Sequence, residues 1–150
     1  MTLQNLAKIG QLKPHAATAA EIQRLLTAVK RNLADAAQQG NSAETCFDCA
    51  YKAIMQCALT AMLASGYRPS PNAPGHHQTM IQSLPLTLGV SNDSWLILDA
   101  LRKKRNLSDY TGVEIEPGVV EECITQAQSL SDLVQKWLRK NHSHLLEPNK

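Results

Sequence analysis

The sequence predicts an all-α protein: one domain built as an antiparallel up-and-down helical bundle of four to five main helices. Three observations carry this prediction. Apolar residues recur at helical spacing over several long segments, whereas strict alternation of β-branched residues is absent. Only 4% of the residues are aromatic, so small and aliphatic side chains must fill the core. The length of 150 residues suits a single domain with one core.

The first elements are a short helical turn and a long amphipathic helix. Residues 1–16 are expected to form a short N-terminal helix and a linker, because Pro14 interrupts the apolar stripe. Thr18 and Glu21 have the spacing of a capping box at the start of the long helix. We expect this helix to end at Gly40 and the asparagine that follows it.

The next helix is rich in small residues, which favours a tightly packed, central position. Ser42 is expected to cap its start, and the helix dipole favours Glu44 in its first turn. Gly66 is expected at its C-terminal end. Residues 67–77 contain three prolines and a glycine and are therefore predicted to form a loop.

The second half of the chain predicts three further helices. A short one is expected over about 77–84. Another is expected to begin after an N-terminal cap at Ser91, Asn92 or Asp93 and to end near Gly112. Pro117 fits the first position of the last helix, which carries a long apolar stripe. Residues 140–150 are predicted to be a frayed tail.

Composition limits the classes of function. A net charge of +2 is too small to predict nucleic-acid binding by bulk electrostatics, although basic residues cluster at 102–105 and 136–140. No segment approaches the roughly 20 apolar residues that span a bilayer, and the N-terminus lacks a secretory signal. We therefore expect a cytoplasmic protein without a membrane partner, and with reduced cysteines.

The common cofactor and catalytic motifs are missing. GxGxxG, P-loop, GxSxG and HExxH patterns are absent, which weakens dinucleotide, phosphotransfer, serine-hydrolase and zinc-protease interpretations. Cys46 and Cys49 form a CxxC pattern, but it lies inside a periodic helix. A zinc site would need two more ligands. We expect core packing for this pair, and neither a metal nor a cofactor for the chain.

The helix expected after Ser91 carries an apolar stripe in its first half, and polar residues occupy the same face in its second half. Continued at helical spacing, its stripe leads to Arg102, Arg105 and Asp109. An arginine directed toward the bundle needs partners, because an unpaired buried charge is costly. Together with Asn106 and Tyr110 it predicts a polar pocket suited to an anion. The alternative is that these cations complement the helix dipole in solvent.

A pair of histidines precedes the short fourth helix. Gly75, His76 and His77 lie at a loop-to-helix junction, where backbone N–H groups attract anions and either imidazole suits acid–base chemistry at neutral pH. The alternative is a capping or packing role at this junction. Asp48 and Asp99 are isolated acids, and nothing in the sequence pairs them as an acid–base couple.

Three segments form an ordered set. They read AYKAIMQCALTAMLASGYRP, GHHQTMIQSL and LDALRKKRNLSDYTG, and a long amphipathic helix follows them. Over about 42–139 this set resembles the HEPN superfamily, named for a nucleotide-binding domain of higher eukaryotes and prokaryotes. The resemblance implies a bundle of four or five helices that is commonly dimeric. Many members are metal-independent ribonucleases of toxins or defence systems, and others are partner subunits of minimal nucleotidyltransferases.

The nuclease motif of that family is an Arg, a polar residue, three variable residues and a His. By resemblance the Arg matches Arg105, the polar residue matches Asn106, and the His position is occupied by Tyr110. Arg105 and Tyr110 are therefore the candidate catalytic residues. A phenol with a pKa near 10 is a poor general base at neutral pH, so we expect weakened catalysis.

Three hypotheses follow. The first is a homodimeric binding module in which Arg105, Asn106 and Tyr110 hold a phosphate-bearing ligand such as RNA or a nucleotide. The second is a metal-independent ribonuclease that uses Arg105 with Tyr110 or a loop histidine. The third is an accessory or antitoxin-like subunit that partners a minimal nucleotidyltransferase. The missing His favours the first and third. The further candidate ligand-binding residues are Arg102, Asp109, His76 and His77.

Overall fold

The chain is mostly helical, as the sequence predicts. The computed structural model describes residues 2–147. Its elements, in order, are α1 (Leu3–Lys8), β1 (Leu12–Pro14), α2 (Ala19–Ala36), α3 (Ala43–Ala64), β2 (Tyr67–Pro69), α4 (His76–Gln82), α5 (Leu84–Thr87), α6 (Asn92–Thr111), α7 (Pro117–Asn141) and the 3-10 helix η1 (Ser143–Leu145).

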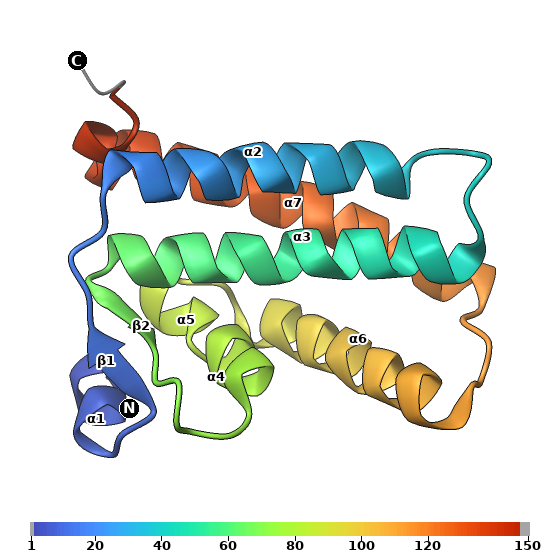
Figure 1. The fold of residues 1–150 in the computed structure, drawn as a ribbon, viewed down its shortest axis with the longest axis horizontal. Helices are drawn as coiled ribbons and strands as arrows, with labels where there is room; N and C mark the ends of the chain where they lie inside the picture. The colour runs from blue at the N-terminus through green and yellow to red at the C-terminus, as the bar shows by residue number, and fades with distance from the viewer. Residues whose placement is uncertain (1, 148–150) are drawn as a thin grey trace.

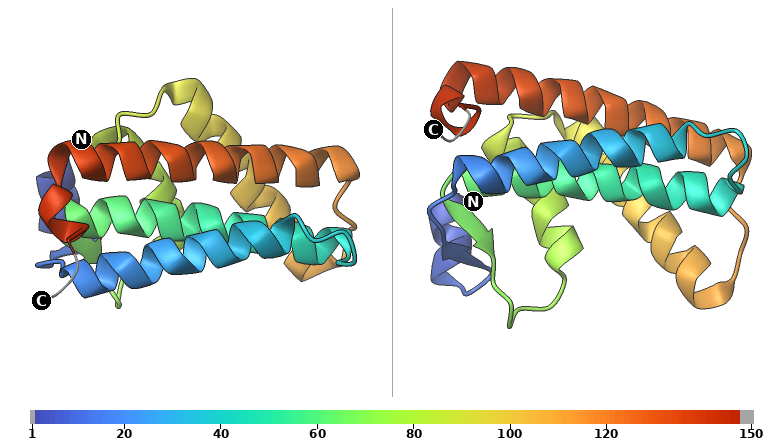
Figure 2. Two further views of the ribbon diagram at one scale, coloured as in Figure 1. Left: turned by 90° about the horizontal axis from the view of Figure 1, so that it is seen from above. Right: turned by 45° about the horizontal axis from the view of Figure 1, so that its top comes forward.

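The long helices form the predicted bundle. Figure 1 shows α2, α3 and α7 side by side along the long axis, with α3 and α7 running opposite to α2. The fourth long helix, α6, runs obliquely, and its C-terminal end diverges from α3 in both Figure 1 and the right-hand view of Figure 2. Between α3 and α6 the chain forms α4 and α5, which pack on the same side of α3 as α6.

The centre of the core is α3, as its small residues predict. Ala50, Ala53 and Ala61 are completely buried and let α2 and α7 approach closely. Larger side chains of the same helix, including Phe47 and Met62, are also buried at 1% exposure or less. A helix that is buried along most of its length is a rigid base for any side chain that it directs toward α4 and α6.

Local sequence signals set most helix starts. In the predicted capping box, the Glu21 backbone N–H donates to Thr18 Oγ1 at 3.2 Å and the Thr18 N–H donates to Glu21 Oε1 at 3.0 Å. Ser42 and Ser91 cap α3 and α6 through their hydroxyl oxygens. Gly112 ends α6 in the left-handed conformation, with φ 72°.

The end of α2 differs from the prediction. The helix stops at Ala36, four residues before Gly40. The side-chain amide of Asn41 folds back and donates to the Asp35 carbonyl oxygen at 2.9 Å. The same carbonyl oxygen accepts the Gln38 N–H at 3.2 Å, so a backbone turn and the Asn41 amide together end the helix before the glycine that was expected to stop it.

Two short strands correct the prediction of a linker and a loop. β1 and β2 pair antiparallel, with Leu12 opposite Pro69 and Pro14 opposite Tyr67. The ladder continues where the His15 N–H donates to the Gly66 carbonyl oxygen at 2.8 Å. Each strand is an edge strand of three residues, where proline is tolerated because the missing N–H is not needed. The prolines therefore predicted correctly that no helix forms at these positions, but they did not predict the strands that form there.

The C-terminal segment is also more ordered than predicted. The last long helix continues to Asn141, and η1 follows it. Leu145 is 6% exposed and packs on the core beside α2, and the ring of His142 lies 4.6 Å from that of Trp137. Residues 140–147 are therefore packed and not frayed, because one apolar side chain anchors them. The remaining part of the predicted tail, 148–150, lies outside the described residues.

Candidate functional site

The structure brings four of the predicted site residues together. His76 and His77, in the first turn of α4, and Arg102 and Asn106, one turn apart on α6, line one open cavity of about 380 Å³. The histidines lie inside α4 and not before it, since Gly75 is the cap and adopts the left-handed conformation with φ 74°. We call these four side chains the α4–α6 site.

Asp99 orients Arg102. The Arg102 Nε–H donates to Asp99 Oδ1 at 2.8 Å, and the two side chains are only 14% and 11% exposed. Lys103 Nζ lies 3.5 Å from the other carboxylate oxygen. Asp99 is therefore not isolated, contrary to the prediction. Because the carboxylate uses Nε, it leaves the two terminal NH₂ groups of Arg102 for a ligand.

Arg105 faces the bundle, as its helical position predicts. Its guanidinium carbon lies 5.1 Å from the centre of the Tyr51 ring, and its side chain is one-third exposed. Its Nε lies 3.7 Å from Asp109 Oδ2, which is an ion pair longer than a hydrogen bond. With His77, Arg105 lines a second cavity of about 310 Å³, whose other walls are Asp48, Tyr51, Lys52 and Met55.

His77 lines both cavities, and a buried tyrosine holds its ring. Tyr51 is 2% exposed, and its hydroxyl lies 3.1 Å from His77 Nδ1. Burial raises the pKa of Tyr51 to about 12, so the phenol stays protonated at neutral pH. This residue was not predicted as part of the site. The available signal was the tyrosine inside a helix of small residues, since a buried phenol requires a hydrogen-bond partner.

The imidazole of His77 is disfavoured as a cation in the ligand-free protein. Burial lowers its pKa below the ordinary 6.5, and its neighbours Arg105, His76 and Arg102 lower it further. Nδ1 faces Tyr51, which leaves Nε2 for a ligand. Next to it, His76 Nε2 is buried and makes no hydrogen bond to any of residues 2–147.

Asp48 has charged neighbours, although the sequence predicted an isolated acid. It shares the second cavity with Lys52 and Arg105. Burial raises the pKa of Asp48, and Asp109 raises it further, whereas Arg105 and Lys52 oppose the shift. The cavity therefore contains both signs of charge, as the α4–α6 site does through Asp99, but its arginine is already engaged by the Tyr51 ring and by Asp109.

The remaining candidates, Asp109 and Tyr110, do not line either cavity. Asp109 is half exposed and serves as the ion-pair partner of Arg105. Tyr110 is 88% exposed. Residues five apart on an α-helix point about 140° away from each other, so Arg105 faces α3 while Tyr110 points to solvent. The pocket of Arg105, Asn106 and Tyr110 expected from the sequence does not form within one chain.

The CxxC cysteines pack against the core, as expected. Cys46 and Cys49 lie on consecutive turns of α3 and are partly buried. Burial raises the pKa of the Cys49 thiol, which disfavours the thiolate that binds metals. In the part of the chain that the structure describes, no group of three or more His, Cys, Asp or Glu side chains is arranged to hold a metal ion.

No family model, curated protein or solved structure matches this chain. Among residues 2–147, no helix combines the length and the apolarity needed to cross a membrane.

Proposed function

We propose that this protein binds a phosphate-bearing ligand, such as RNA or a nucleotide, at the α4–α6 site, without efficient catalysis. The observation that carries the proposal is the convergence of Arg102 and Asn106 with His76 and His77 in one open cavity. These groups come from two helices that are separated by a loop and α5, and they supply the hydrogen-bond donors that a phosphate requires.

The arginine is the strongest element of the proposed site. A guanidinium matches two phosphate oxygens with parallel N–H bonds, and its planar fork loses little freedom when it is already held. The hydrogen bond that Arg102 donates to Asp99 at 2.8 Å provides that hold. Asn106 adds an amide donor, and His77 Nε2 adds a ring nitrogen that accepts or donates according to its protonation. Lys103, whose Nζ lies 3.5 Å from Asp99, adds a further positive charge beside Arg102.

We propose that catalysis is inefficient because neither tyrosine near Arg105 in the sequence or in the structure is suited to act as a general base. Tyr110, at the position of the family's histidine, is exposed at 88% and lies away from Arg105. Tyr51 is close to Arg105 but has a pKa of about 12, so at neutral pH it does not remove a proton from a ribose hydroxyl. The groups around Arg105 are thus better suited to holding an anion than to general base catalysis.

Titration calorimetry of inorganic phosphate at pH 7 tests the proposal. Arg102→Gln should weaken binding about tenfold, the size expected for one lost charge-assisted contact. The matched control is Arg139→Gln, because Arg139 is an exposed arginine on α7, outside the site. Equal affinity of the wild type and Arg102→Gln would contradict the proposal. Metal-independent cleavage of RNA that is lost in Arg105→Ala would instead favour the ribonuclease alternative.

We also propose that the chain forms a homodimer through the outer face of α6. Large apolar side chains are exposed there and just beyond it: Leu96 at 53%, Leu107 at 47%, Tyr110 at 88% and Val113 at 52%. Several large apolar side chains along one helix face are more than the single, scattered exposure that is ordinary on a protein surface. By helical spacing, Leu96, Leu107 and Tyr110 lie on the side of α6 opposite to its buried residues Leu98 and Leu101. A second copy is the occupant that the family resemblance favours.

Leu107→Glu is expected to convert the dimer to a monomer, because a carboxylate would be buried in the apolar contact. Sedimentation velocity at one protein concentration measures the outcome. Leu133→Glu is the matched control: Leu133 is also exposed, at 38%, but it lies on α7. A wild-type protein that sediments as a monomer would contradict the dimer and leave the α6 face for a different partner, as the accessory-subunit hypothesis requires.

A further inference from the structure

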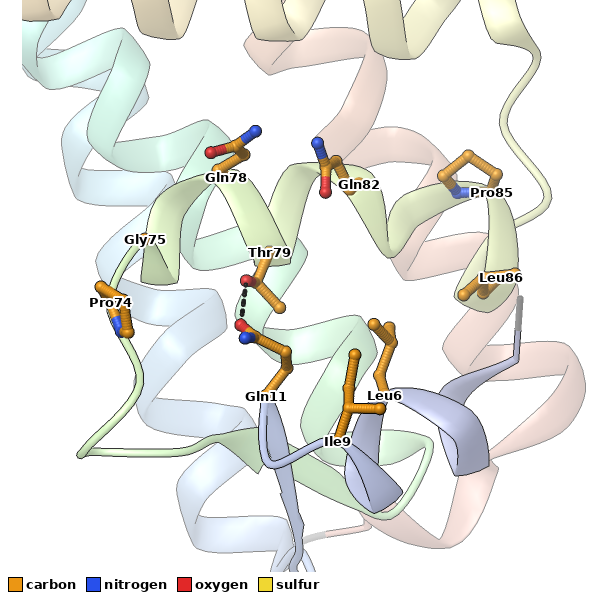
Figure 3. A pocket seen from close by; sticks show the side chains of 10 residues that line it. All are labelled: Leu6, Ile9, Gln11, Pro74, Gly75, Gln78, Thr79, Gln82, Pro85 and Leu86. Carbon is orange, nitrogen blue, oxygen red and sulfur yellow. Dashed lines mark hydrogen bonds between the residues drawn. The ribbon is translucent and has the colours of Figure 1, made fainter.

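A larger cavity lies on the other side of α4. It has a volume of about 580 Å³, is open to solvent on one side, and is lined by the N-terminal segment, α4 with the two residues before it, and α5. Figure 3 shows Leu6 and Ile9 rising from α1 and its end toward α4, with Leu86 of α5 at the far side. A cavity of this size and partly apolar lining accommodates a small organic molecule.

The polar side chains of this cavity are three amides and one hydroxyl. Gln78 and Gln82 lie one turn apart on α4, and Gln11 approaches from the N-terminal segment (Figure 3). The Thr79 hydroxyl donates to Gln11 Oε1 at 3.3 Å, which holds that amide in place. Within the described residues, the side chains of Gln78 and Gln82 are exposed and make no hydrogen bond to another residue.

The lining carries no charged side chain. Its residues are apolar, amide, hydroxyl or glycine, so the cavity suits an uncharged group with hydrogen-bond donors and acceptors at its edge. An amide side chain offers one acceptor and two donors, and it pairs in a bidentate manner with the edge of a base such as adenine. Aliphatic side chains such as those of Ile9 and Leu86 cover the faces of a flat ring by dispersion.

This amide-lined cavity adjoins the α4–α6 site. Pro74, Gly75 and Gln78 line both cavities, so only the start of α4 separates them. The α4–α6 site contains the arginine and imidazoles that suit a phosphate, whereas the amide-lined cavity contains uncharged amides. A molecule that joins a phosphate to a neutral heterocycle through a short spacer matches both sides.

We propose that the ligand is a nucleotide bound across the start of α4, with its phosphate in the α4–α6 site and its base in the amide-lined cavity. This inference rests on the proposed phosphate-binding function and narrows it to a ligand class. Gln82 is the diagnostic residue, because it lines the amide-lined cavity and not the α4–α6 site.

Calorimetry with adenosine 5′-monophosphate and ribose 5-phosphate tests the inference. We expect adenosine 5′-monophosphate to bind about tenfold more tightly than ribose 5-phosphate. Gln82→Leu should remove most of that difference and leave the affinity for ribose 5-phosphate unchanged. Gln128→Leu is the matched control, because Gln128 is an exposed residue of α7. Thermal unfolding should be unchanged in both variants, since both glutamines are exposed.

The outcomes separate this inference from the function on which it rests. Equal affinities for adenosine 5′-monophosphate and ribose 5-phosphate, unchanged in Gln82→Leu but weakened in Arg102→Gln, would overturn the base cavity and retain the phosphate site. Failure of both phosphates to bind, with no effect of Arg102→Gln, would overturn the phosphate site itself and the inference with it.

Discussion

Replacing Phe47 with alanine is expected to lower the free energy of unfolding by about 3–5 kcal/mol, the usual cost of removing a buried aromatic side chain. Phe47 is the largest of the fully buried side chains, at 1% exposure. It lies one turn into α3, near the N-terminal end of that helix, and the Cys123 thiol of α7 donates to its carbonyl oxygen at 3.9 Å. Its removal would leave a cavity between rigid helices that cannot collapse to fill it.

The same substitution should disturb the candidate site. The Phe47 ring stacks on the Tyr51 ring with centroids 6.3 Å apart, and Tyr51 in turn contacts both His77 and Arg105. Urea unfolding followed by circular dichroism measures the stability change. Leu96→Ala, at a position that is 53% exposed, is the control and should change stability by no more than about 0.5 kcal/mol. A loss below about 1 kcal/mol in Phe47→Ala would show that α3 is not packed as described.

The second large effect is a pH dependence of anion binding that originates at His77. Sulfate is the probe, because it remains a dianion between about pH 5 and pH 8. We expect its affinity to rise roughly ten- to a hundredfold as the pH falls across that range, the size of a charge-assisted hydrogen bond. The gain arises because a bound anion stabilises the imidazolium that burial and the neighbouring arginines disfavour in the free protein.

The sign of this effect follows from the direction of the pKa shift. In the free folded protein the pKa of His77 is lowered below 6.5, so the unfolded chain takes up this proton first. The contribution of His77 to stability is therefore complete above pH 6.5 and is lost as the pH falls toward the folded pKa. An anion bound in the site should raise the pKa of His77 in the folded protein, and should thereby cancel the loss of stability at low pH.

Several other groups face His77 and are part of the expected response. They are His76 on its own helix, Arg102 and Arg105 on α6, and Tyr51, Asp48 and Lys52 on α3. His77→Gln isolates the contribution of the imidazole, because an amide still reaches Tyr51 but does not titrate. His15→Gln is the matched control, since His15 pairs with Glu21 at 2.8 Å, away from the site. An unchanged pH dependence in His77→Gln would assign the effect to another group.

Local signals in the sequence were sufficient for most of the secondary structure. The Thr18–Glu21 capping box and the serine caps act within one helical turn, so their energetics do not depend on distant residues. Helical spacing of apolar residues likewise identified which face of each long helix is buried. The strands around Pro14 and Pro69 escaped prediction, because three residues carry too little pattern to distinguish a paired edge from a loop.

The candidate site was only partly predictable. Arg102, Arg105 and Asn106 were identified because one helix carries them, and His76 and His77 because a loop-to-helix junction with histidines is chemically distinctive. That these two groups share a cavity depends on how α4 packs against α6. Tyr51 was missed for the same reason, since its partner His77 lies 26 residues away in the chain.

The sequence by itself determined the helical bundle, the central position of α3 and the polar character of the 102–110 segment, because these depend on composition, period and spacing within a few turns. Only the tertiary structure decided that Arg105 turns to Tyr51 while Tyr110 turns to solvent, that Asp99 holds Arg102, and that α4 joins α6. Those outcomes depend on the oblique packing of α6 and on contacts between helices far apart in the chain, whose free energies no local pattern encodes.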